Sequence, residues 1–587
     1  MRKFAVVSER TLQICASLAA LLFLVSGVVY LYLGRATVTH SNLWRLYEIY
    51  LTHSWFESAL LKVDNHSLFF PTFLLLANLR FFHGDQQPLF IAGLALLFIT
   101  ASLVLTPIWR DETIGLTAKI VATLVVIVGN FWMGRASIIA LGGFNCQNSL
   151  AMAGAALAFL LLPKMCAGPP RRLLSRTLIV VCAGFLASFS FSAGLAIWPT
   201  MLLLAWCLRL PRYSVGLLAV AGLTAAVIFV LLPPAREDLQ TPQLLPPVAY
   251  IAAAAWLCPL VGSPFSYAVF AWWPDKLSRQ LVESPGLALY AGAVGLVLAV
   301  LAVAPQIIHR NVQKSRLEFT GMALIVFTLF ALLLVAAGRS GFRQLSSTLA
   351  PRYLFWSTLF WTGLLLVAIQ RAESKKWLRW PVYVVALALP VLVFPRQYKD
   401  GLDRRNARRA AEFAATSLVN GIRDDQQVRS LFVNTGQVYH VAERLRAHRL
   451  DMFADGLQDW IGVGEANLFG GRHEREGLRG EGRVDALVPS DNGTPSARVV
   501  GQASTHGDLI PETLVIVDPA GVVRGVARSA PISRFINRTF YRGRFSDRDF
   551  LGYIRNYNPE LKYSVRSADD GILSEETIPV QIPVKDL

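Results

Sequence analysis

The stretch TLQICASLAALLFLVSGVVYLYL, residues 11–33, has no charged side chain and is long enough to cross about 30 Å of hydrocarbon as a helix. PLFIAGLALLFITASLVLTPIW, residues 88–109, has the same character. Hydrophobic residues make up 54% of the 587 residues and charged residues only 16%, which excludes a single soluble domain. We therefore expect an integral membrane protein in which 11–33 is a retained first helix and not a cleaved signal.

The net charge of +17 is concentrated in one part of the chain. Residues from Arg396 onward carry 27 Lys+Arg against 26 Asp+Glu, whereas the residues before it carry 29 against 13. The basic excess thus lies between the apolar stretches, which is the pattern of cytoplasmic loops in membrane proteins. This placement argues against a nucleic-acid partner.

Apolar segments and basic loops together predict a topology with a cytoplasmic N-terminus and an extracytoplasmic C-terminal domain. Two further apolar segments, 68–82 and 248–273, are interpreted as interfacial or re-entrant, the second because several prolines interrupt it. The expected crossings are 11–33, 88–109, 119–138, 148–163, 176–190, 193–207, 214–232, 286–306, 319–337, 353–371 and 379–395.

The composition changes abruptly at Arg396, so we expect a membrane domain at 1–395 and a separate domain at 396–587. Helices are expected at 400–420 and 441–453. Short β runs follow at 483–489, 497–503, 514–518 and 521–527, separated by turn signals such as Asp491-Asn492-Gly493. The sequence predicts a small α+β domain with a β-sandwich half.

Residues able to form a site occur in several outer loops. Arginines are depleted from such loops, so those between 339 and 352 indicate an anionic ligand. Trp and Tyr stack on sugars, but an outer-loop Trp more often belongs to the interfacial belt, and Arg beside a helix can snorkel. The candidates are Glu48, Trp55, Glu57, Asp64 and His66 in the first loop, Gln147 in a smaller one, Trp272 and Trp273, and Arg339, Arg343, Arg352 and Tyr353.

Asp64 is the candidate general base of this set. It immediately precedes an apolar run, which places its carboxylate near lipid headgroups, and His66 could orient it or carry the proton. The competing interpretation is a solvated loop carboxylate, and Glu48 and Glu57 are alternative bases. The six cysteines lie at no metal-ligand spacing, so no metal site is predicted.

The layout resembles the polytopic GT-C glycosyltransferases, which take sugars from polyprenyl-phosphate carriers. Three stretches carry the resemblance: Asp64-Asn65-His66-Ser67-Leu68-Phe69-Phe70-Pro71, FSFSAGLAIWP at 189–199, and Gly338-Arg339 through Pro351-Arg352-Tyr353. In that fold the first-loop acid is the catalytic base or a metal ligand, which the resemblance assigns to Asp64. Some members have two adjacent acids there, whereas this chain has Asn65 after Asp64, which weakens a metal-ligand role.

The resemblance implies an inverting transferase of a bacterial inner membrane that moves a sugar from a polyprenyl-phosphate donor to a periplasmic glycan, lipid or protein. Asp64 and His66 would be catalytic, Arg339, Arg343, Arg352 and Tyr353 would hold the donor phosphate, and the other candidates would contact sugar or acceptor. No cofactor is required, although Mg²⁺ or Mn²⁺ is compatible with it. The alternatives are a flippase for a lipid-linked glycan and an outer-leaflet polymerase or ligase.

Overall fold

The structure is a computed structural model that describes residues 2–141, 146–166, 170–235, 247–309, 315–339, 348–470, 473–474, 478–505, 511–529, 534–543, 548–568, 573–574 and 576–582. Its contacts divide the chain into two compact units. The first unit comprises Met1–Leu33, His53–Leu74 and Phe90–Gly401, and the second comprises Gly34–Thr52, Leu75–Leu89 and Leu402–Leu587. Parts of the predicted first outer loop therefore pack with the C-terminal region.

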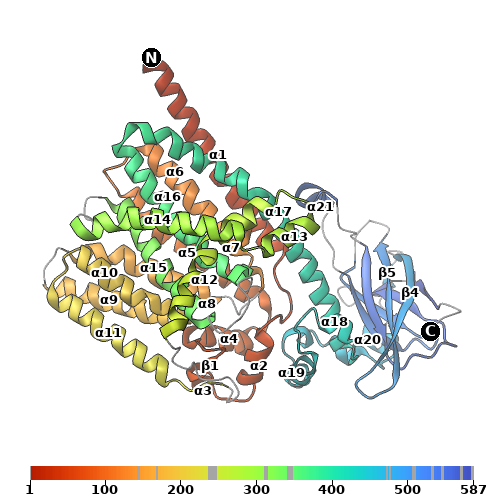
Figure 1. The fold of residues 1–587 in the computed structure, drawn as a ribbon. Helices are drawn as coiled ribbons and strands as arrows, with labels where there is room; N and C mark the ends of the chain where they lie inside the picture. Colours follow the sequence, from red (N-terminus) through yellow and green to blue (C-terminus); the bar gives the residue numbers. More distant parts are fainter. Residues whose placement is uncertain are drawn as a thin grey trace. The chain divides into compact units, whose positions relative to one another are not determined.

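The first unit is built of helices, with one short β-hairpin (Figure 1). Three of its helices, α4, α5 and α17, continue into segments of the second unit. The helices are α1 (Arg2–Leu33), α3 (Trp55–Leu60), α4 (Phe69–Phe81), α5 (Gln86–Trp109), α6 (Leu116–Phe131), α7 (Met133–Ala136), η1 (Ile139–Leu141), α8 (Cys146–Leu161), η3 (Leu162–Met165), α9 (Pro170–Ser188), η4 (Ser192–Ala196), α10 (Ile197–Cys207), α11 (Arg212–Leu231), α12 (Pro247–Phe270), α13 (Asp275–Glu283), α14 (Gly286–His309), α15 (Arg316–Arg339), η7 (Pro351–Tyr353), α16 (Leu354–Ser374) and α17 (Lys376–Val419).

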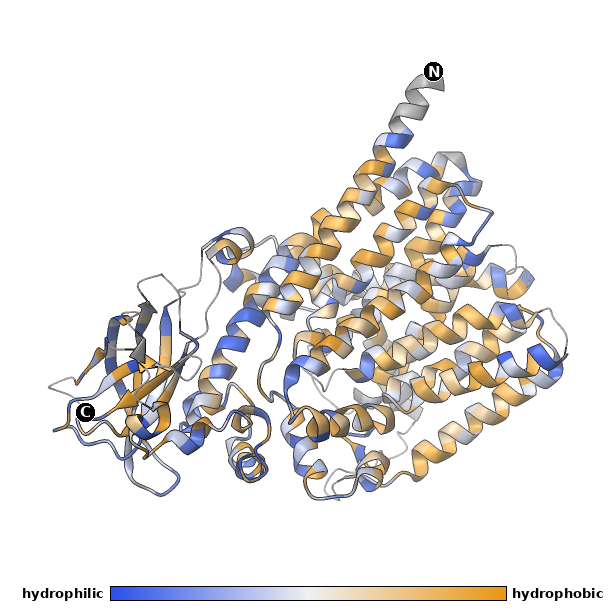
Figure 2. Ribbon diagram, turned by 180° about the vertical axis from the view of Figure 1, so that it is seen from behind, coloured by the Kyte–Doolittle hydropathy of each residue, from blue (hydrophilic) through white to orange (hydrophobic). Residues whose placement is uncertain are grey.

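Within the described residues, nine helices are long and apolar enough to cross a membrane, where the sequence predicted eleven crossings. The two that fall short are 176–190 and 193–207. The first lies in α9, whose opening turns carry Arg171, Arg172 and Arg176, and the second is divided between η4 and the eleven-residue α10. Figure 2 shows the helices of the first unit largely in the colour of hydrophobic residues, so a multi-pass membrane protein is supported.

Glycines bring neighbouring helices of this unit close together. A Cβ added at Gly292 of α14 would lie 1.7 Å from the carbonyl oxygen of Cys258 in α12, and one at Gly262 would lie 1.9 Å from a backbone oxygen of α14. Gly321 and Gly363 bring α15 and α16 together in the same way. Small residues allow such close backbone packing between helices in lipid, where the hydrophobic effect does not drive association.

Helix α12 differs from the interrupted segment that its prolines suggested. It continues through Pro259 and Pro264 over 24 residues and packs against α14, α15 and α16. Proline is tolerated inside membrane helices because neighbouring helices and Ser or Thr side chains satisfy the freed backbone groups. Ser263, which bonds the Leu260 carbonyl at 2.9 Å, is one such side chain.

The second unit contains further helices and a β-barrel (Figure 1). The predicted strands are present, and the predicted helix at 400–420 is the end of α17. The elements are α2 (Leu43–Tyr50), α18 (Asp425–Val428), α19 (Thr435–Ala447), η8 (Asp451–Phe453), η9 (Leu457–Trp460), α20 (Glu465–Phe469), β3 (His473–Glu474), β4 (Leu478–Pro489), β5 (Pro495–Thr505), β6 (Thr513–Val517), β7 (Val523–Ser529), α21 (Arg534–Tyr541), β8 (Asp549–Ile554), β9 (Ser564–Ser567), β10 (Leu573–Ser574) and β11 (Ile578–Gln581).

The predicted β-sandwich is wrong, because seven strands close into a barrel in the order β11-β4-β5-β8-β7-β6-β9. Closure depends on the short strand β11, which pairs in parallel with β4 and antiparallel with β9. Alternating apolar residues fill one core in either architecture. The core side chains include Val499, Ile516, Phe550 and Val565, all of them buried.

Segments from the first outer loop are fixed to the C-terminal region within this unit. The Ser41 amide donates to the Leu431 carbonyl at 2.8 Å, and the Thr39 amide donates to Asp451 Oδ2 at 2.9 Å. Helix α2 packs against α19. The hydrogen bond between Thr39 and Asp451 joins residues 412 positions apart, which periodicity alone does not indicate.

Candidate functional site

The Asp-x-His motif forms a β-hairpin in the first unit. Strand β1 (Lys62–Val63) pairs antiparallel with β2 (His66–Ser67), and Val63 lies opposite His66. The two loop residues both have positive φ, 49° at Asp64 and 62° at Asn65. Positive φ at both central residues is the signature of a type I′ turn.

The conformation of this turn is by itself a reason for an Asp at position 64. Asp and Asn adopt left-handed backbone more readily than other non-glycine residues, because their short polar side chains can bond locally. Asn65 is exposed and Asp64 is half-buried. A carboxylate here is compatible with catalysis, but the backbone alone already favours Asp or Asn.

The hairpin also carries a buried cation. The backbone of Lys62 bonds the Pro233 carbonyl and the Ala235 amide, both at 2.8 Å. Its ammonium group donates to the Val230 carbonyl at 3.4 Å and lies 5.6 Å from the ring centroid of Phe229. Burial lowers the pKa of Lys62. Lys62 was not among the predicted site residues, because a lone Lys in a loop gives no signal in the sequence.

His66 is held by the second stretch that carries the family resemblance. Its Nδ1 lies 2.5 Å from Ser192 Oγ, and its ring centroid lies 4.3 Å from that of Phe191 at an interplanar angle of 33°. The hairpin and the start of η4 are thus joined by one hydrogen bond and one ring contact, across 126 positions of sequence.

The helix that follows the third stretch, α16, joins the same cluster through Trp356. Phe191 stacks on Trp356 with centroids 6.3 Å apart and an angle of 11°. Trp356 lies on the first turn of α16, directly after Arg352-Tyr353, and is 1% exposed. Two of the stretches and the helix that follows the third therefore meet around the ring of Phe191. We call His66, Phe191, Ser192 and Trp356 the motif cluster.

The structure describes the side chain of only one of the three arginine candidates, Arg352. Arg352 is exposed, and its guanidinium carbon lies 5.1 Å from the ring centroid of the buried Tyr353. Arg339 is the last residue of α15, but its side chain lies outside the described part of the chain. Arg343 also lies outside the described residues. The phosphate-binding role of this group therefore stays a prediction.

Two first-loop candidates belong to the short helix α3. The hydroxyl and the amide of Ser54 donate to the Glu57 carboxylate at 2.7 and 3.0 Å, forming a capping box. The hydrogen bond from the Ser54 side chain is the main cause of a lowered pKa for Glu57. Trp55 is 41% exposed. The capping role accounts for a Glu at position 57. The exposed ring of Trp55 can still contact a ligand.

The printed contacts of the next three candidates are made with residues other than those of the motif cluster. Glu48 belongs to the second unit, where it accepts a short hydrogen bond from Gln437. Trp272 donates to the Leu392 carbonyl at 3.1 Å, and Lys399 donates to the Trp273 carbonyl at 2.7 Å. Both tryptophans are at least half exposed, as in an interfacial belt.

Gln147 and Arg135 are buried polar residues near the predicted outer end of α6 and α8. Gln147, a predicted sugar contact, is 2% exposed, and its Oε1 has no partner in the part of the chain that the structure describes. Arg135 was missed. It is 1% exposed, donates to the Phe355 carbonyl and to Asn130 Oδ1 at 3.1 and 2.8 Å, and lies over the Phe355 ring. These bonds tie α7 to α16.

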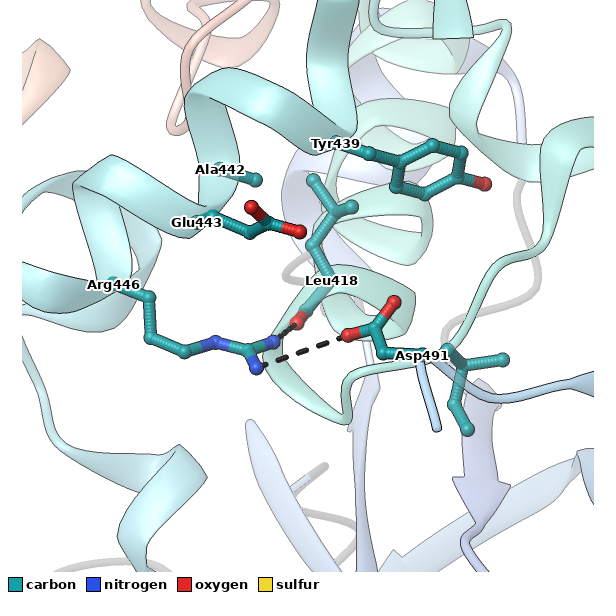
Figure 3. Close-up of a pocket in the computed structure, with 7 residues that line it drawn as sticks. Leu418, Tyr439, Ala442, Glu443, Arg446 and Asp491 are labelled. Atoms are coloured by element: carbon teal, nitrogen blue, oxygen red, sulfur yellow. Dashed lines mark hydrogen bonds and ion pairs between the residues drawn. The ribbon is translucent and has the colours of Figure 1, made fainter. Parts of the chain in front are cut away.

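A metal cluster is absent from the described residues, and a small pocket lies in the second unit. No group of three or more His, Cys, Asp and Glu side chains there could hold a metal ion. One pocket of the second unit has a cavity volume of about 10 Å³, room for about one water. Figure 3 shows its Arg446 directed at the Leu418 carbonyl and Asp491. The lining residues are Leu418, Ile422, Tyr439, Ala442, Glu443, Arg446 and Asp491.

Comparisons with known proteins give one distant likeness. No family model matches the sequence, and no curated protein matches it. Among solved structures, the chain is similar to the archaeal oligosaccharyltransferase AglB from Archaeoglobus fulgidus, solved in complex with an inhibitory peptide and a dolichol-phosphate. The match has 13% sequence identity and a TM-score of 0.36, and covers 74% of this chain and 61% of that one. At this score the likeness carries no argument about activity.

Proposed function

We propose that this protein is a membrane glycosyltransferase that moves a sugar from a polyprenyl-phosphate donor to an extracytoplasmic acceptor. The observation that carries the proposal is the motif cluster. Two stretches that resemble GT-C enzymes, separated by more than 100 residues, meet through His66 and Phe191, and the helix that follows the third stretch joins them through Trp356. Each stretch alone is short, but their convergence is typical of a site.

The chemistry of such a site needs a base and fixed cations. Asp64 and His66 form the basic pair toward the acceptor hydroxyl, and Arg339, Arg343, Arg352 and Tyr353 receive the leaving phosphate. Arginine binds phosphate oxygens through two parallel N–H donors, which stabilises the charge that develops as the bond to the sugar breaks. Attack by the acceptor on the opposite face of the sugar inverts the configuration.

The partners follow from the same chemistry. The donor carries its own activation in the bond to phosphate, so the reaction requires no nucleotide cofactor; Mg²⁺ or Mn²⁺ is compatible with it. The acceptor is an envelope glycan, lipid or protein at the outer face of a bacterial inner membrane. Trp55, Glu57, Gln147, Trp272, Trp273 and Glu48 remain candidate sugar and acceptor contacts.

The test is release of free polyprenyl phosphate. The purified protein in lipid nanodiscs is incubated with a panel of radiolabelled polyprenyl-phosphate hexoses, hexosamines and pentoses and a cell-envelope fraction as acceptor. Wild-type protein should release the carrier phosphate. Intact donor that moves across a vesicle membrane without release would instead identify a flippase and refute the proposal.

Asp64→Asn is the appropriate variant because asparagine also tolerates the left-handed turn, so the hairpin keeps its shape. Asp64→Ala would cost about 1–2 kcal/mol of backbone strain and would confuse folding with chemistry. We expect Asp64→Asn to lower release at least about 100-fold with unchanged thermal stability. The control is Asp85→Asn, which removes an exposed carboxylate from the same predicted loop. Equal turnover in both variants would remove Asp64 from catalysis.

A further inference from the structure

Arg135 is a buried cation whose described hydrogen-bond partners are all neutral. It lies on α7 and is 1% exposed. Its Nε donates to the Phe355 carbonyl at 3.1 Å, and its Nη1 donates to the carbonyl and the side-chain oxygen of Asn130 at 3.3 and 2.8 Å. The second terminal nitrogen, Nη2, is buried and has no acceptor in the part of the chain that the structure describes. A guanidinium group can only donate, so Nη2 needs an acceptor.

Other arginines of the first unit contact carboxylates. Arg371 lies 3.8 Å from Glu318, and Arg379 lies 2.7 Å from Glu9. The side chains of these two arginines are 37% and 34% exposed, whereas Arg135 is enclosed. A buried charge without an opposite charge is costly, and an ionisable residue at membrane depth is by default a candidate for a functional site.

The sequence on either side of this contact contains no acid that could balance Arg135. Residues 113–236 include α7, residues 319–372 include η7 and most of α16, and neither range has an Asp or a Glu. Among the described residues, the atoms that bond Arg135 are amide and carbonyl oxygens. The arrangement therefore favours an anion that comes from a ligand.

Trp132 supplies a second donor on the same turn. Its indole Nε1 is buried and lacks an acceptor among the residues that the structure describes. The ring is held against α7, since a Cβ added at Gly134 would lie 2.6 Å from it. An indole N–H is also a donor only. Two donor-only groups three residues apart thus both need an acceptor, and a phosphate oxygen has the charge that Arg135 requires.

The position of α7 suits a phosphate carried by a lipid. Arg135 lies one residue before the end of the candidate span Leu116–Ala136, at its predicted outer end, which is the depth of lipid headgroups. Helix α7 packs against η7, which carries Arg352 of the predicted phosphate-binding group. The Phe355 ring lies 4.2 Å from the Arg135 guanidinium and 5.0 Å from Trp356 of the motif cluster.

We propose that Arg135 binds a phosphate oxygen of the donor lipid through Nη2, with the indole N–H of Trp132 as a second donor. This inference rests on the proposed transferase function and deepens it, because it adds a buried cation to the arginines predicted to hold the donor phosphate. An ordinary phospholipid headgroup and free phosphate offer the same chemistry, and the experiments below distinguish these sources.

The first experiment measures binding of tritiated polyprenyl phosphate to the full-length protein in dodecyl maltoside micelles, which contain no phosphate. Arg135→Gln should weaken binding at least about tenfold, the loss expected for hydrogen bonds to a charged group. Arg135→Lys keeps the charge but not the planar fork, so its affinity should lie between the two. Trp132→Phe should weaken binding about threefold or more. Unchanged affinity in both Arg135 variants overturns the proposal, and unchanged affinity in Trp132→Phe removes Trp132 from it.

The second experiment separates binding from a purely structural role through the Tm. Arg371→Gln is the matched control, because Arg371 also donates to helix carbonyls, those of Leu301 and Ala302 at 3.1 and 2.7 Å. Polyprenyl phosphate should raise the Tm of wild type and of Arg371→Gln, but not that of Arg135→Gln. An equal rise in all three contradicts the inference. If Arg135→Gln does not fold, Arg135→Lys and Trp132→Phe decide by the same two measurements.

Competition identifies the source of the phosphate. Unlabelled polyprenyl phosphate should displace the tritiated carrier at much lower concentration than phosphatidylglycerol or inorganic phosphate. Equal displacement by either competitor would identify a general phosphate site and overturn the assignment to the donor. If carrier binding depends on Arg135 but wild-type protein releases no carrier from polyprenyl-phosphate sugars, the proposed transferase function fails while the phosphate site stands.

Discussion

Replacing Asp451 by Asn should remove a loss of stability that the second unit undergoes as the pH rises. Asp451 is fully enclosed, and its Oδ2 accepts the Thr39 amide at 2.9 Å. Its own amide donates to the His83 carbonyl at 2.6 Å. Asp451 thus fixes one segment of the predicted first outer loop through its carboxylate and another through its backbone amide, and its positive φ of 53° is one that asparagine also tolerates.

The magnitude follows from the pKa. Burial is the largest influence and raises the pKa of Asp451 from 3.8 to about 6, although the bonds from Thr39 oppose it. At 1.36 kcal/mol per pH unit, ionising this group in the folded protein costs about 3 kcal/mol. Because the folded pKa is raised, the favourable contribution is complete below pH 4 and is lost as the pH rises through 6. Asp451→Asn has no such dependence.

Hydrogen exchange at the Thr39 amide, corrected for the intrinsic effect of pH on exchange, measures this locally. Between pH 4 and pH 7 the opening free energy should fall by about 2.4 kcal/mol in wild type relative to Asp451→Asn, because the carboxyl of the open state is already more than half ionised at pH 4. Asp424→Asn is the control, because that buried carboxylate is paired with Arg498 at 2.9 Å and with Tyr553 at 2.9 Å. Its loss should destabilise the unit by about 3 kcal/mol. Parallel pH curves for wild type and Asp451→Asn would refute the reasoning.

Two further substitutions test the packing of each unit. Gly292→Val should separate α12 from α14, because its Cβ would fall 1.7 Å from the Cys258 carbonyl oxygen. The yield of monodisperse protein should therefore drop sharply. The control is Gly216→Ala, which should leave the yield unchanged because nothing lies within 4 Å of the added Cβ. Phe550→Ala should destabilise the barrel by about 3–5 kcal/mol, since the ring is 2% exposed; denaturant unfolding followed through barrel amides measures this, and a loss below about 1 kcal/mol would show that the cavity collapses.

Hydropathy predicted the membrane helices well because each helix carries its own signal within about 20 residues. The same holds for β4 to β7, whose strands and turn signals are local. Within the described residues, two predicted crossings fall short of a spanning helix in length or hydropathy, one where arginines enter α9 and one where a serine- and glycine-containing stretch forms η4. The prolines of α12 suggested an interrupted segment, whereas the helix is continuous. Neighbouring helices, and not the local sequence, decide whether a proline breaks a membrane helix.

Barrel closure could not be predicted from the sequence, because it depends on one pairing between distant strands. Strand β11 has four residues and gives a weak local signal, yet its pairing with both β4 and β9 converts an open sheet into a barrel. The contact between His66 and Ser192 is invisible for the same reason. The two residues lie 126 positions apart, and only the tertiary packing of the first unit brings them together.

The hairpin explains why one residue separates Asp64 from His66. A two-residue turn places His66 directly opposite Val63, so its side chain emerges on one defined face of the ribbon. Side chains alternate between faces along a strand, so a change of one residue in the loop would turn the imidazole to the other face, away from Ser192 and Phe191. The residue between Asp64 and His66 therefore cannot be deleted or doubled, although its own side chain is exposed. The two-residue loop of the Asp-x-His motif therefore fixes the register of β1 and β2, and this register places the His66 side chain against Phe191 and Ser192.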